Sequence, residues 1–173
     1  PEMDADFVCI TDDPNLRSDY WEMEVHREYM HLHPRMAGKV FKCLPPFKGR
    51  SLFIDGSIEI VDPNILEELG KYLNRGFAVY QHPSGRTCIE TELRESLPMV
   101  KYQGLPLKEQ VRHYFDEGLP RDYGLHACGV ILRDGDHREL GSKWLLENFI
   151  WSYQDQLSLP YVRWKYNYKI DTI

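Results

Sequence analysis

The sequence predicts an α/β fold in which a mostly parallel central sheet is flanked by helices. Short apolar runs alternate with amphipathic segments along nearly the whole chain, which is the pattern of strand–helix–strand units. The 173 residues are 42% hydrophobic, which is sufficient for one domain with a substantial core. We therefore expect residues 1–173 to form a single domain.

Five segments are expected to form strands. Four are apolar runs and the fifth alternates like an edge strand; in chain order they are residues 5–11, 21–26, 52–54, 77–80 and 128–132. The first run begins so near residue 1 that we expect a preceding strand of the sheet to be absent from this chain.

Six helices are expected between and after these strands. Pro34 opens the first and Pro45 ends it, while Asp62 and Pro63 begin the second. The others cover residues 87–97, 107–115 and 136–149, followed by a last helix that ends near residue 165. We expect that last helix to be kinked or restarted at Pro160.

Composition excludes several classes of protein. The net charge of −6 argues against a general nucleic-acid binder, which needs a basic surface. No apolar run approaches the roughly 18 residues of a membrane span, and no segment resembles a signal peptide. The four cysteines lie far apart in apolar surroundings, which favours buried free thiols over a zinc site or disulfides. We interpret the chain as a cytoplasmic protein.

Polar residues follow three of the predicted strands. They are Thr11, Asp12 and Asp13, then Asp55, Gly56 and Ser57, then His82. In an open α/β sheet, ligands bind in the crevice beyond the carboxyl ends of the strands. Acid, glycine and hydroxyl at such an end suit a metal–phosphate pair. Asp55-Gly56 is equally typical of a hairpin turn, and the sequence leaves both interpretations open.

A basic stripe is predicted on the first helix. Arg35, Lys39 and Lys42 recur at a spacing that places them on one helical face. Such a stripe in an acidic protein could hold a diphosphate, because Arg and Lys neutralise phosphate directly. An ordinary solvated face is the alternative.

Four segments carry a resemblance to a known family. They read DFVCITDDP (residues 6–14), FIDGSIEI (53–60), GLHACGVILR (124–133) and DQLSLPYV (155–162). In this order they resemble the glycosyltransferase-like family known as domain of unknown function 616. Its small members occur in bacteria, plants and large algal viruses, one of them involved in capsid glycosylation. The resemblance covers about residues 4–166.

The resemblance implies a GT-A fold, a Rossmann-like domain that binds a nucleotide diphosphate-sugar with Mn²⁺ or Mg²⁺. It assigns the metal to Asp55 beside Gly56, although Ser57 stands where the full motif has a second acid. A hydroxyl ligates a hard cation only weakly. It also implies that Thr11, Asp12 and Asp13 lie near the nucleotide, with Arg35, Lys39 and Lys42 on the helix facing it.

The same resemblance assigns the sugar end of the donor to Asp155 and Gln156, which match a pair that retaining enzymes place against the donor sugar. Asp155 is also a normal first-turn acid of a helix. His82 and His126 are expected near the acceptor, or as hydrogen-bonded structural histidines.

We expect a metal-dependent glycosyltransferase that moves a sugar from a UDP-sugar to a hydroxyl of a glycan or glycoprotein, with retention of configuration. One rival is a catalytically weak nucleotide-sugar-binding module, favoured by the incomplete metal motif. The other is a phosphohydrolase of the haloacid-dehalogenase kind. That chemistry uses Asp-x-Asp-x-Thr, and residues 55–59 lack its second Asp and its Thr.

Overall fold

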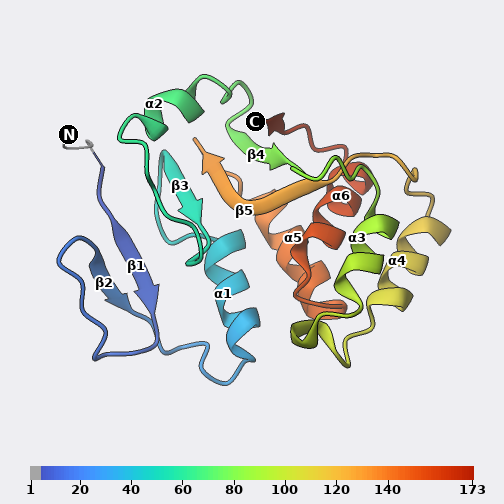
Figure 1. The fold of residues 1–173 in the computed structure, drawn as a ribbon, viewed down its shortest axis with the longest axis horizontal. Coiled ribbons are helices and arrows are strands. Elements are labelled where there is room, and N and C mark those ends of the chain that lie inside the picture. Colours follow the sequence, from blue (N-terminus) through green and yellow to red (C-terminus); the bar gives the residue numbers. More distant parts are fainter. Residues whose placement is uncertain (1–4) are drawn as a thin grey trace.

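The computed structural model describes residues 5–173 and combines two sheets with six α-helices in this range (Figure 1). All five predicted strands and all six predicted helices form. In chain order the elements are β1 (Val8–Thr11), β2 (Glu22–Val25), α1 (Pro34–Cys43), β3 (Ser51–Ile54), α2 (Ile65–Gly70), β4 (Phe77–Gln81), α3 (Ile89–Ser96), the 3-10 turn η1 (Val100–Tyr102), α4 (Leu107–Asp116), β5 (His126–Arg133), α5 (Arg138–Ile150), α6 (Asp155–Lys165) and β6 (Asp171–Thr172).

The main sheet has the order β3-β5-β4-β6, and its central pairings are antiparallel. β5 runs antiparallel to both β3 and β4, while β6 pairs with β4 in parallel. The prediction of a mostly parallel central sheet is therefore wrong. Two helices, α3 and α4, connect β4 to β5 and return the chain to the carboxyl end of β4. β5 therefore starts beside that end and runs in the opposite direction. There, His82 after β4 donates its backbone N–H to the carbonyl oxygen of Leu125 before β5.

β1 and β2 form a separate, parallel two-stranded sheet. In Figure 1 this blue pair lies to the left of α1 and β3, at the end of the molecule opposite α3 and α4. The aromatic rings of His26 and Tyr29, which follow β2, contact Phe41 of α1 at centroid distances of 4.9 and 5.4 Å. These contacts hold the segment after β2 against α1.

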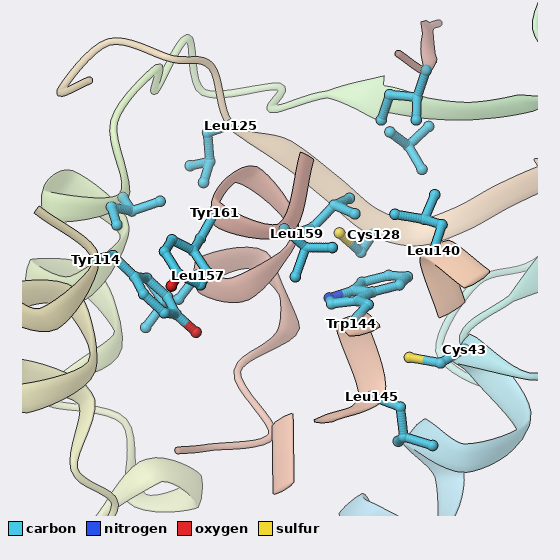
Figure 2. Close-up of a cluster of buried hydrophobic side chains, with 14 of the residues drawn as sticks. Cys43, Tyr114, Leu125, Cys128, Leu140, Trp144, Leu145, Leu157, Leu159 and Tyr161 are labelled. Carbon is cyan, nitrogen blue, oxygen red and sulfur yellow. The ribbon is translucent and has the colours of Figure 1, made fainter. Parts of the chain in front are cut away.

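The main sheet is covered on both faces. Successive side chains of a strand point to opposite faces, so Phe77 and Val79 of β4 join the larger core cluster while Ala78 joins a smaller one with Leu69 of α2. The larger cluster is filled by α4, α5 and α6. It contains the stacked rings of Tyr114 and Tyr161, whose centroids are 3.9 Å apart (Figure 2).

Helix α6 runs as one element through Pro160, so the restart expected there does not occur. The indole of Trp144, which is fully buried, fixes the first turn of this helix: its Nε1–H donates to Asp155 O and to Ser158 Oγ, each at 3.1 Å. Figure 2 shows this indole between α5 and α6. Within residues 5–173, no helix has both the length and the apolar character needed to cross a membrane.

Candidate functional site

A cavity of about 940 Å³ lies between the two sheets. Its walls come from β1, α1, β3, the turn after β3 and the first residues of α6. It gathers eight of the residues singled out in the sequence, namely Arg35, Lys39, Lys42, Asp55, Gly56, Ser57, Asp155 and Gln156. Segments from the first and last thirds of the chain therefore meet in one place.

The basic stripe of α1 faces this cavity. Arg35, Lys39 and Lys42 all line it, and Lys42 is only 2% exposed. Pro34 supplies the first helical position and His33 caps the helix, its Nδ1 accepting the N–H of Arg35 at 3.2 Å. The alternative of an ordinary solvated face is wrong for Lys42, because its ammonium group is buried.

Asp155 is held by two of these lysines. Its Oδ2 lies 2.6 Å from Lys39 Nζ and 2.7 Å from Lys42 Nζ. Burial alone would raise the pKa of the Asp155 carboxyl, but the charges and hydrogen bonds of Lys42 and Lys39 lower it to about 2. Burial would likewise lower the pKa of Lys42, whereas Asp155 and Asp55 raise it above its usual value. Both groups are therefore ionised at neutral pH.

Asp55 is the more open carboxylate of the site. Its side chain is 44% exposed, and Oδ1 lies 3.3 Å from Lys42 Nζ. The chain turns here, since Ile58 N–H donates to Asp55 O at 2.9 Å. No hairpin follows, because β3 pairs with β5 instead of with the next segment. The hairpin interpretation of Asp55-Gly56 is thus wrong.

The residues present fit a divalent cation only if a ligand supplies part of its shell. Within residues 5–173, no cluster of three or more His, Cys, Asp or Glu side chains could hold a metal. Asp55 and Ser57 offer one carboxylate and one hydroxyl to the cavity. Mg²⁺ is commonly bound by one or two carboxylates together with ligand phosphates and water, and this donor set is compatible with that mode.

Five predicted site residues lie away from this cavity. Thr11 and Asp13 support the turn after β1, where Thr11 Oγ1 accepts Asp13 N–H and Asp13 Oδ1 accepts Asn15 N–H. Asp12 is exposed in the same turn. Residues 11–13 do not line the cavity, although Ile10 before them and Arg17 after them do.

The two predicted histidines are buried in other surroundings. His82 lies 3.6 Å from Glu92 and contacts Arg86 and Ser84. His126 lies 3.2 Å from Arg163 Nη1, and burial lowers its pKa to about 3, so it is neutral. Neither lines the cavity.

Sequence reasoning missed three cations of the cavity. Arg17, Lys101 and Arg133 also line it, so six cationic side chains face two carboxylates. Arg17 and Lys101 lie outside the predicted elements. Arg133 directly follows the predicted apolar strand of residues 128–132. An arginine that ends a buried strand is unusual enough to have signalled a functional position.

One comparison identifies relatives of the chain. A family model described as TOD1/MUCI70, glycosyltransferase-like domain, matches residues 9–172. This match confirms the resemblance to a glycosyltransferase-like family. No curated protein and no solved structure matches the chain significantly. Because the matched region covers nearly the whole chain, the protein belongs to the TOD1/MUCI70 glycosyltransferase-like family.

Proposed function

We propose that this chain transfers a sugar from a UDP-sugar to a hydroxyl of a glycan or glycoprotein. The observation that carries the proposal is the charge of the cavity. Six cationic side chains and two carboxylates line it, although the protein as a whole has a net charge of −6. A cavity whose charge is opposite to that of the protein suits an anionic ligand, and a diphosphate supplies that charge.

The diphosphate is assigned to helix α1. Lys39 and Lys42 converge at its cavity face, and Arg35 lies one helical turn before Lys39. A guanidinium can bind a phosphate through two parallel hydrogen bonds, while each lysine contributes a point charge. These groups would stabilise the negative charge that develops on the departing UDP.

Mn²⁺ or Mg²⁺ is part of the proposal, held by Asp55 and Ser57 together with the diphosphate. When bound, the cation would add to the neutralisation of the leaving group. The exposed carboxylate of Asp55 supports this assignment. Lys42 Nζ, 3.3 Å from Asp55 Oδ1, would also orient that carboxylate.

The donor sugar is assigned to Asp155 and Gln156. The carboxylate of Asp155 stays ionised under all ordinary conditions, because its pKa is about 2. A fixed negative charge stabilises the positive charge that develops at the anomeric carbon as the glycosidic bond breaks. Asp155 and Gln156 lie together at the start of α6 and both line the cavity. Retention of configuration follows the same assignment.

The proposal is tested by measuring product release with Mn²⁺ and a panel of nucleotide sugars. Release of UDP from a UDP-sugar, with or without an added glycan acceptor, is the expected result. Release of inorganic phosphate from sugar phosphates would instead indicate a phosphohydrolase. Binding of UDP without turnover of any donor would indicate a binding module.

A further inference from the structure

A second cavity, of about 310 Å³, adjoins the first. It lies between the end of α1, the loop 45–49 and the start of α5. The two cavities share four lining residues, namely Pro45, Phe47, Ser51 and Arg133. The smaller cavity is therefore an extension of the larger one past Arg133, and its volume is within the range of small-molecule sites.

Arg133 is a buried charge without a counter-charge. It is 3% exposed, and its Nη2 donates to the carbonyl oxygen of Lys42. Its Nε and Nη1 have no hydrogen-bond partner in the part of the chain that the structure describes. No carboxylate of residues 5–173 forms an ion pair with it, and its guanidinium lies 5.2 Å from the ring centroid of Phe77. Buried charges of this kind are normally paired, because an unpaired one is costly.

The smaller cavity has two further cations in its lining. Lys48 and Arg138 line it with His137, and the first turn of the 13-residue helix α5 begins there. The amino-terminal end of a helix favours negative charge. The one carboxylate in the lining, Asp136, accepts the backbone N–H of Arg138 at 2.9 Å and pairs with its side chain, at 3.7 Å from Nε. Three permanent cations thus surround a space with one engaged carboxylate.

We propose that this smaller cavity binds an anionic group, either a phosphoryl or a carboxylate group, with Arg133 as its innermost partner. Lys48, Arg138 and the start of α5 hold the same group from the open side. The smaller cavity continues from the larger one, which the proposed function assigns to the UDP-sugar and which we call the donor cavity. The anionic group in the smaller cavity therefore belongs to the acceptor. The acceptor is therefore an acidic glycan, phosphorylated or containing a uronic acid. This last step rests on the proposed function, whereas the anion site itself rests on Arg133 and its surroundings.

The test measures binding of two probes, inorganic phosphate and glucuronate, by calorimetry with the donor cavity filled by UDP and Mn²⁺. The double variant Lys48→Ala/Arg138→Ala should weaken the binding of at least one probe by tenfold or more. Lys71→Ala/Arg121→Ala removes the same charges from exposed positions outside both cavities, and it should bind like the wild type. Arg133→Met should abolish binding. If Arg133→Met does not fold, the Lys48→Ala/Arg138→Ala variant still decides whether the cavity binds an anion.

The probes separate the two ligand chemistries. Phosphate binding alone indicates a phosphorylated acceptor, and glucuronate binding alone indicates a uronic acid. No binding of either probe, or equal affinities in the wild type and the Lys48→Ala/Arg138→Ala variant, would overturn the anion site. If UDP fails to bind, the probes are tested in its absence on a Lys39→Ala background. Binding that depends on Lys48 and Arg138 would then uphold the anion site and remove its assignment to an acceptor.

Discussion

Lys42 Nζ lies 2.7 Å from Asp155 Oδ2, so the end of helix α1 is joined to the start of helix α6 by a buried ion pair. Lys42 is 2% exposed and Asp155 is 5% exposed. Removing one partner of such a pair leaves a buried, uncompensated charge, which typically costs about 3–5 kcal/mol. The same pair lines the candidate donor cavity, so stability and function are coupled at this point.

This coupling predicts loss of stability in acid. The pKa of Asp155 falls from its usual 3.8 to about 2 on folding. Its contribution to the free energy of unfolding is therefore complete above about pH 4 and is lost as the pH falls through 2. The shift corresponds to roughly 2 kcal/mol. Urea denaturation between pH 2 and 5 should show a shallower pH dependence for Asp155→Asn than for the wild type, and equal slopes would contradict the assignment.

Lys39→Ala is expected to weaken binding of UDP more than binding of uridine. Lys39 Nζ lies at the cavity next to Asp155, and a hydrogen bond to a charged group is typically worth about 1.5–3 kcal/mol. Calorimetry with both ligands measures the difference. Lys71→Ala, which changes an exposed lysine paired with Glu68, serves as the control. Equal losses for uridine and UDP would mean that Lys39 does not contact the diphosphate.

Asp55→Ala is expected to remove the dependence of UDP binding on Mn²⁺ or Mg²⁺. The reason is that Asp55 supplies the only exposed carboxylate among the described residues lining the cavity. UDP affinity is measured with the cation and with EDTA. Asp116→Ala changes an exposed acid of α4 outside the cavity and should keep the wild-type response. Wild-type binding that is unaffected by EDTA would exclude a metal role for Asp55.

Gly141→Ala is expected to destabilise the protein severely. Gly141 lies in α5, and a Cβ at this position would overlap the carbonyl oxygen of Cys43 at the end of α1. A backbone oxygen cannot move aside without displacing the helix. Gly38→Ala, in the interior of α1, meets nothing within 4 Å and should stabilise by about 1 kcal/mol. Thermal or urea unfolding of the pair provides the measurement, and similar melting temperatures would show that α1 and α5 are not in close contact.

The sequence predicted five of the six strands and all six α-helices of residues 5–173, but not β6, η1 or the arrangement of the sheet. Periodicity reports which face of a segment is buried, and this located α1 with Lys39 and Lys42 on one side. Strand direction depends on how many helices separate two strands and how they pack. The reversal at β5, which follows the α3–α4 pair, was therefore not visible.

Local sequence patterns also did not show which candidate residues line the same cavity. Asp55 follows β3 directly and lines the cavity, whereas β1 lines it only through Val8, Cys9 and Ile10, and residues 11–13 at its end do not. The ion pair between Lys42 and Asp155 joins distant segments, and no local pattern indicates it. The family resemblance, not spacing, singled out Asp155.

The most decisive change is Asp155→Asn, which keeps the size of the side chain and removes its charge. If Asp155 stabilises the positive charge that develops at the anomeric carbon, turnover of the donor should fall by about a hundredfold or more. This is the usual scale, about 10²–10³-fold, for one lost electrostatic contact. UDP binding should be no weaker, because Lys39 and Lys42 lose a competing carboxylate and remain available to the diphosphate. Turnover and UDP affinity are measured separately, at a temperature where the variant is folded.

Loss of stability must be separated from loss of chemistry, because Asp155 is also half of a buried ion pair. Leu159→Ala provides the control: Leu159 is fully buried in the same helix, and its truncation should cost about 2–5 kcal/mol without changing the charge of the site. That variant should melt earlier yet turn over donor at nearly the wild-type rate while folded. If Asp155→Asn behaves in the same way, Asp155 is a structural ion-pair partner and the sugar is stabilised by another group.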